Sequence, residues 1–135
     1  MSNPTISISW LQDRGIEVLN RPGGKIPLPR NTVIEAPASL KWTEYVHMIH
    51  LGAFSYQVSG YCFAAKIGRY CSFGEDVHIG RQNHPMTWIS TSPAFYLRDR
   101  LFSLSDGFSG AKEYHSYKFS FTGPPTKVKI TTIGN

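Results

Sequence analysis

The stretch Ile67-Gly68-Arg69-Tyr70-Cys71-Ser72, Phe73-Gly74-Glu75-Asp76-Val77-His78 and Ile79-Gly80-Arg81-Gln82-Asn83-His84 repeats one six-residue pattern three times. Each block begins with an apolar residue, continues with glycine and has a smaller residue in fifth place. Such a short repeat is typical of stacked β-coils, in which each unit packs only against its neighbours. The pattern therefore predicts an all-β, parallel β-helix in which each block supplies one short strand and one corner.

Other parts of the chain restate the pattern less regularly. Residues 51–56 form a clear block, whereas residues 57–60 shift the phase by four positions and predict a bulging loop. Residues 61–66 restore the frame, with Ala65 in fifth place. The chain from 61 to 84 is therefore expected to wind continuously.

We expect a single domain with four parts along the chain. Residues 1–32 alternate short apolar stretches with turns and predict a β-rich N-terminal cap, and residues 33–84 form the coils. Residues 85–126 lack the repeat and are rich in aromatic side chains, which predicts a non-repeat excursion loop. Residues 127–135 return to the coil, and because the sequence stops at the third residue of a block, we expect a β-helix that is incomplete at its C-terminus.

Charge and composition exclude several classes of protein. The net charge of +5 comes from dispersed basic residues without an adjacent run, so we expect no nucleic acid partner. No signal peptide and no apolar stretch of about 20 residues is present, which predicts a cytoplasmic protein without membrane insertion. Cys62 and Cys71 are too few for a disulfide framework and are interpreted as core thiols.

The three blocks and the segment that follows them, Pro85-Met86-Thr87-Trp88-Ile89-Ser90-Thr91-Ser92-Pro93-Ala94-Phe95-Tyr96, resemble the hexapeptide-repeat acyltransferases. The resemblance is to the branch of xenobiotic acetyltransferases and polysaccharide O-acetyltransferases, and it covers about half of the chain. It implies a left-handed β-helix, usually a homotrimer, with acetyl-coenzyme A in a groove between neighbouring coils. It also implies a loop histidine that acts as a general base.

His84 occupies the place of that histidine. A hydroxyl is a poor nucleophile until a group that titrates near neutrality takes its proton during attack on the thioester carbonyl. By the same resemblance, Asn83 fixes the loop and, with Trp88, Phe95 and Tyr96, contacts a saccharide or similar hydroxyl acceptor. Packing is an equally good interpretation of Trp88 and Tyr96. The residues that bind coenzyme A are not indicated.

The remaining histidines are interpreted as structural. His78 stands at the same place one block earlier than His84 and is expected at a corner on the coil exterior. His47, His50 and His115 belong to no motif.

Three alternatives stay open. A metal site of Cys62, Cys71, His78 and His84 has the right ligand types but the wrong spacing, and a carbonic-anhydrase-like site needs three converging histidines where only His78 and His84 are near in sequence, so we expect no metal. A noncatalytic coil that binds a glycan or serves in assembly, or a fragment without a complete coenzyme A site, is the second alternative. The third is an O-acetyltransferase that acts on an antibiotic. By analogy we prefer a sugar to an antibiotic as the acceptor.

Overall fold

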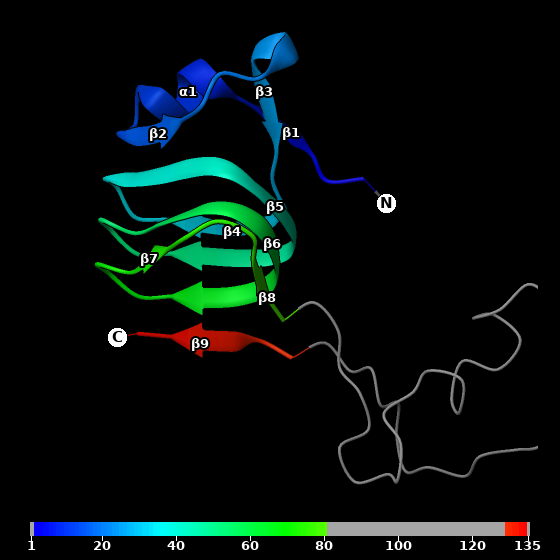
Figure 1. Ribbon diagram of the computed structural model, residues 1–135. Coiled ribbons are helices and arrows are strands. Elements are labelled where there is room, and N and C mark those ends of the chain that lie inside the picture. Colours follow the sequence, from blue (N-terminus) through cyan, green and yellow to red (C-terminus); the bar gives the residue numbers. More distant parts are fainter. Residues whose placement is uncertain (1, 81–128, 135) are drawn as a thin grey trace, which may run out of the picture. The chain divides into compact units, whose positions relative to one another are not determined.

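Residues 2–80 and 129–134 fold into β-strands with almost no helix. The computed structural model describes residues 2–80 and 129–134 (Figure 1). Within them the longest elements are two strands, β5 and β6. The elements are, in order, β1 (Thr5–Ser7), α1 (Ile8–Gln12), β2 (Ile16–Val18), η1 (Pro22–Gly24), β3 (Lys25–Pro27), β4 (Asn31–Ile34), β5 (Ala38–Leu51), β6 (Tyr56–Ile67), β7 (Ser72–Phe73), β8 (Val77–Ile79) and β9 (Thr131–Ile133).

One curled parallel sheet holds most of these strands. β5 and β6 pair in parallel, although only residues 52–55 connect them. Parallel strands in a flat sheet need a crossover of about a dozen residues or more, so a connection this short requires the strands themselves to curve. Figure 1 shows this curvature in both strands. The all-β prediction is therefore confirmed, with a curled parallel sheet as its main element.

From β4 to β8, the register of the sheet is nearly constant. Leu40 pairs with Gln57, 17 positions later, and Leu51 pairs with Ile67, 16 positions later. The same displacement of 17 separates the partners in β4 with β5 and in β6 with β8. After residues 81–128, β9 pairs in parallel with the end of β6. We call each set of residues that pairs with the next in this way a layer. Equivalent residues of successive layers therefore lie directly above one another.

Apolar side chains on one face of the curled sheet form the core. Ile34, Leu51, Ile67 and Ile133 occupy one position of the register in four layers, and Leu51 and Ile67 are almost fully buried. Leu40 and Ile49 are fully buried in β5. Each such side chain contributes roughly 1.5–3 kcal/mol through removal of apolar surface from water.

The predicted loop at residues 57–60 is wrong, because these residues belong to β6. Gln57 is buried there, and Gly60 adopts a φ of +109° at the point where the strand passes Val77. A Cβ atom on Gly60 would lie 2.1 Å from the carbonyl oxygen of Val77. The irregular spacing thus reflects a close approach of two strands, and glycine allows it without a loop.

The frame of the neighbouring block also differs from the expected one. Cys62 is fully buried, whereas Tyr61, the first residue of its block, is only half-buried. The register shifts between Tyr45 and Met48 of β5, where one extra residue forms a bulge against β6. The pairing of β5 with β6 is therefore locally irregular beside this block.

The N-terminal segment contains both short strands and a helix. Ser7 caps α1 by accepting a hydrogen bond from the amide of Trp10, and Ile8 and Leu11 pack into the core. Between the parts of β5 that pair with β2 and β4, side chains bind the carbonyl groups instead: Asn3 donates to Tyr45 and Val46, and Arg21 donates to Lys41. Polar side chains thus provide hydrogen-bond donors to the carbonyl groups of β5 where no described strand pairs with it.

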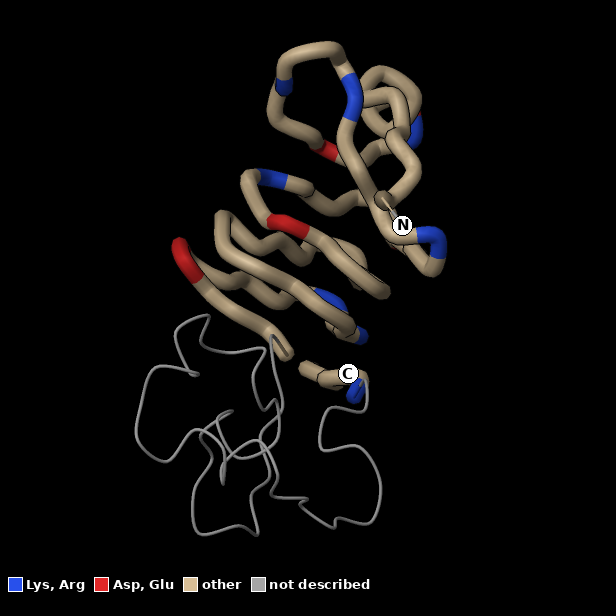
Figure 2. The backbone as a smooth tube through the Cα atoms, turned by 90° about the vertical axis from the view of Figure 1, so that its right-hand side faces the viewer, with Lys and Arg blue, Asp and Glu red and all other residues tan. Residues whose placement is uncertain are grey.

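Charged residues are distributed over the whole described part of the chain. Figure 2 shows Lys and Arg positions in the N-terminal segment, along the curled sheet and near β9. Within the described residues, the backbone therefore carries no continuous basic track of the kind that follows a phosphate backbone. No helix in this part of the chain has the length and apolar character needed to cross a bilayer.

Candidate functional site

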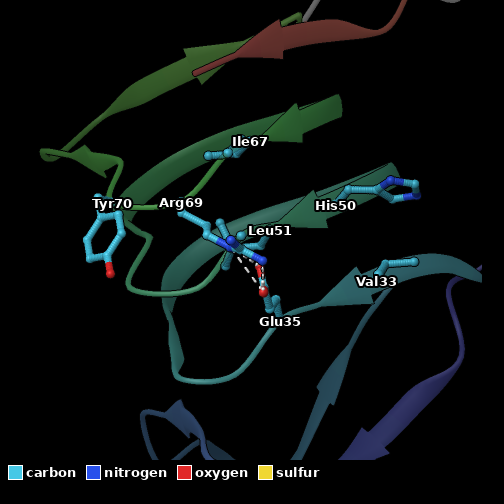
Figure 3. A pocket seen from close by; sticks show the side chains of 9 residues that line it. Val33, Glu35, His50, Leu51, Ile67, Arg69 and Tyr70 are labelled. Atoms are coloured by element: carbon cyan, nitrogen blue, oxygen red, sulfur yellow. Dashed lines mark hydrogen bonds and ion pairs between the residues drawn. The ribbon is translucent and has the colours of Figure 1, made fainter. Parts of the chain in front are cut away.

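An open groove of about 750 Å³ lies beside one corner of the curled sheet (Figure 3). It is built from the ends of β4, β5 and β6 and from the turn that follows β6. Its lining residues are Val33, Glu35, His50, Leu51, Gly52, Ile67, Gly68, Arg69 and Tyr70. Figure 3 shows Tyr70 at one end, His50 toward the other and the Arg69 and Glu35 side chains between them.

The register explains which side chains face the groove. Val33 pairs with His50 at an outward position, while the next position along each strand points into the core. Gly52 follows at the corner, where a Cβ atom would lie 2.5 Å from the backbone carbon of Gly68. Only glycine permits this approach of the two layers. The groove wall is therefore bare backbone at the corner, with side chains on either side.

An ion pair crosses the groove between layers that are far apart in sequence. Arg69 donates from Nε to both carboxylate oxygens of Glu35, at 3.0 and 2.9 Å, and from Nη2 to Oε1 at 2.5 Å. The Ala53 amide donates to the same carboxylate at 3.3 Å. The hydrogen bonds from Arg69, followed by that from Ala53, hold the pKa of Glu35 below its ordinary value. Because both side chains are largely exposed, the pair orients these groups more than it stabilises the fold.

Two aromatic rings stack at the same corner in successive layers. Phe54 and Tyr70 have ring centroids 5.0 Å apart and ring planes within 4° of parallel. Both residues have positive φ angles, +58° and +60°, which are outliers for bulky side chains. Yet 55% of Phe54 and 75% of Tyr70 is exposed. The corner thus exposes two stacked aromatic rings to solvent in spite of an unfavourable backbone.

Ser55 fixes this corner from the inside. Its buried hydroxyl donates to the carbonyl of Gly68 at 2.7 Å and accepts from the amide of Cys71 at 2.9 Å. The Tyr70 amide also donates to the carbonyl of Ala53 at 3.0 Å. These bonds join consecutive layers on both sides of Tyr70. The aromatic pair is therefore held by a rigid support.

A second aromatic strip runs across the outside of β5, β6 and β8. His47 stacks on Phe63, Phe63 on Tyr61, and Tyr61 on His78, with centroid separations of 5.6, 6.5 and 6.3 Å. His78 is exposed, but it lies within β8 and not at a corner. Aromatic side chains at outward positions of neighbouring strands therefore also stack on one another.

The residues expected to carry catalysis and acceptor binding lie outside the described part of the chain. These are His84, Asn83, Trp88, Phe95 and Tyr96. The groove residues were not identified as a site from the sequence, and His50 was interpreted as structural. The signal that points to the groove is the 16-residue step from Phe54 to Tyr70, which aligns two aromatic residues once the register is known.

The two cysteines occupy different environments. Cys62 is fully buried, and burial raises the pKa of its thiol to about 11. Cys71 is half-buried at the corner, and both thiols are free. Among residues 2–80 and 129–134, no group of three His, Cys, Asp or Glu side chains is placed to hold a metal ion.

Comparisons with known proteins gave no match to this chain among protein-family models, curated proteins or solved structures.

The groove offers binding groups more than reactive ones. Its described lining residues include a carboxylate, a guanidinium, an imidazole and a phenol, and no serine, threonine or cysteine. Glu35 and Arg69 neutralise each other, so that the groove presents hydrogen-bonding groups of both kinds without a large net charge. Such a surface suits a ligand with many hydroxyl groups.

Proposed function

We propose that the chain is a left-handed parallel β-helix acetyltransferase that moves an acetyl group from acetyl-coenzyme A to a hydroxyl of a saccharide or similar acceptor. The parallel register of 16 to 17 residues supports this proposal, because it is close to the 18 residues of three hexapeptide blocks. The six-residue blocks that end in Asn83 and His84 add the second support. A cytoplasmic homotrimer without a bound metal completes the proposal.

His84 acts as the general base in this proposal. Its imidazole takes the proton of the acceptor hydroxyl while the hydroxyl oxygen attacks the carbonyl carbon of the acetyl thioester. The carbon–sulfur bond then breaks, and the thiol of coenzyme A leaves with a proton. Asn83 orients the loop, and Trp88, Phe95 and Tyr96 surround the acceptor. No covalent enzyme intermediate is needed.

The test is an acetyl transfer assay on the full chain with a panel of saccharide acceptors. Release of free thiol measures turnover, and mass spectrometry identifies the acetyl ester. His84→Ala should lower turnover by roughly a hundredfold to ten thousandfold, the usual contribution of a positioned general base. His78→Ala is the matched control, since it removes an exposed histidine one block earlier and should leave turnover unchanged.

Each outcome decides between the candidate functions. Turnover retained by a folded His84→Ala variant would contradict the role of the base. A wild-type chain that neither binds acetyl-coenzyme A nor releases thiol would favour the noncatalytic binding or assembly module. Turnover with an antibiotic hydroxyl but with no saccharide would shift the acceptor class.

A further inference from the structure

We propose that the corner formed by Phe54 and Tyr70, together with the adjoining groove, is a docking site for a neutral saccharide chain. The site consists of described residues only and does not include His84. It does not depend on acetyl transfer, so binding is expected whether or not the chain is an enzyme.

The backbone at this corner is the first argument. An L-residue in the left-handed region costs about 1–2 kcal/mol, and glycine or asparagine would avoid most of this cost. Phe54 and Tyr70 adopt this conformation although more than half of each residue is exposed, so burial does not explain the choice of residue. Strained residues of this kind are concentrated at ligand-binding sites.

The shape of the corner is the second argument. The two rings are nearly parallel, with centroids 5.0 Å apart in consecutive layers, so Phe54 covers one face of Tyr70; Tyr70, which is 75% exposed, provides the flat aromatic platform. The C–H groups on one face of a sugar ring pack against such a surface through dispersion and removal of apolar area from water. Because Phe54 packs against it from the neighbouring layer, the Tyr70 ring is held in place for this contact.

The polar groups beside the platform favour a neutral ligand. Glu35 compensates the charge of Arg69, which leaves little attraction for a phosphate. The carboxylate accepts hydrogen bonds from sugar hydroxyls, and the guanidinium, which contacts Glu35 through Nε and Nη2, donates from Nη1. His50 provides a further polar group toward the other end (Figure 3).

The dimensions of the groove agree with an oligosaccharide. Its volume of about 750 Å³ lies within the roughly 300–1,000 Å³ found for ligand sites. Ligand sites combine apolar or aromatic surface with a few polar groups that fix orientation, and this groove has both.

Isothermal titration calorimetry with maltohexaose, cellohexaose and fully N-acetylated chitohexaose, without acetyl-coenzyme A, tests the proposal. We expect the full chain to bind at least one of them, and Tyr70→Ala and Phe54→Ala to raise its Kd by at least about tenfold. Trp42→Ala is the matched control, because Trp42 is similarly exposed but lies outside the groove. Its Kd should equal that of the wild type.

Tyr70→Asn separates a binding role from a structural one. Asparagine tolerates a positive φ, so this variant should keep the wild-type unfolding temperature within a few degrees yet lose saccharide affinity. Failure of the wild type to bind any of the three oligosaccharides would overturn the proposal, even if acetyl transfer were observed. So would a Tyr70→Ala variant that binds normally but changes its oligomeric state in light scattering, since the platform would then be an interface between copies.

Discussion

Two sets of residues stack from layer to layer in the curled sheet: the inward ladder, which is the core position of Ile34, Leu51, Ile67 and Ile133, and the outward corner of Phe54 and Tyr70. They differ in how far their side chains are buried. At the inward position, Leu51 and Ile67 lie one above the other and are almost fully buried. At the corner, Phe54 and Tyr70 also lie one above the other, but they are mostly exposed and have unfavourable backbone angles. The inward ladder stabilises the fold through burial of apolar surface, whereas the corner destabilises it slightly and leaves aromatic side chains accessible to solvent.

The inward ladder and the corner place different requirements on the residue type. Any apolar side chain of the right volume satisfies a ladder position, since burial is roughly proportional to apolar area. A corner with positive φ is satisfied best by glycine or asparagine, so aromatic residues there call for another reason. The comparison predicts large losses of stability from changes within the layers and small ones at the corner.

Gly60→Ala should have the largest effect on stability. The added methyl group would meet the Val77 carbonyl oxygen at 2.1 Å, so the two layers must separate. We expect a loss above about 4 kcal/mol, visible as loss of the cooperative transition in urea. Gly23→Ala is the control: φ is +82° there too, but no atom lies within 4 Å of the new Cβ. Equal losses in the two variants would contradict the tight contact between layers.

Ile49→Ala tests the burial of the inward face of the sheet. Ile49 is fully buried, so its truncation leaves a cavity and should lower the free energy of unfolding by about 2–5 kcal/mol. Val33→Ala in β4 removes methyl groups from a residue that is 56% exposed, and we expect a change below about 0.5 kcal/mol. Urea titration of both variants measures the difference. Similar losses would mean that the inward and outward faces are assigned incorrectly.

Ser55→Ala should have an intermediate effect, because it removes the hydroxyl that joins consecutive layers at the corner. The Gly68 carbonyl and the Cys71 amide would each lose a hydrogen bond, at a cost of about 1–3 kcal/mol. Amide hydrogen exchange should then accelerate at Cys71 while remaining slow in the middle of β6. Uniform acceleration across the sheet would show that Ser55 acts on global stability instead of on the corner.

The smallest effect at neutral pH concerns the two thiols. Burial raises the pKa of Cys62 from 9.0 to about 11, so unfolding releases its proton only in alkaline solution. Its contribution to stability is complete below pH 9 and falls between pH 9 and about 11, by at most about 1.4 kcal/mol per pH unit. Iodoacetamide at pH 8 should modify the half-buried Cys71 and spare Cys62 in the folded protein.

Urea titrations of the wild type and Cys62→Ala at pH 8 and pH 10 check this prediction. The wild type should lose more stability than the variant over this interval, because only the wild type carries the buried thiol. An identical decline in both, or modification of both thiols in the folded protein, would contradict the assignment of Cys62 to the core.

The periodic sequence allowed the β class of the chain to be predicted, because glycine after an apolar residue recurs at several corners, as at Gly52, Gly68 and Gly134. The position of Gly60 was misinterpreted as a loop, since the contact with Val77 depends on a layer 17 residues away. The bulge in β5, opposite Cys62 and Ala64, likewise depends on the pairing with a neighbouring strand. Local spacing does not reveal contacts that depend on the register between layers.

The groove was not predicted from the sequence. Glu35 and Arg69 are 34 positions apart, and nothing in either segment alone indicates that they form an ion pair. The pairing of Phe54 with Tyr70 becomes visible only after the displacement of 16 is known. The catalytic prediction for His84, in contrast, came from a motif, and it lies outside the described residues.

Spin labels on the outward ladder test most directly the central claim that equivalent residues stack in successive layers. Val33, His50, Lys66 and Thr132 occupy one register position in four layers. With labels at residues 33 and 132, in a background with both cysteines replaced by alanine, dipolar spectroscopy should give a narrow distribution. Three strand spacings place these backbone positions about 14 Å apart. A broad distribution extending well beyond the reach of the labels from that spacing would contradict the account.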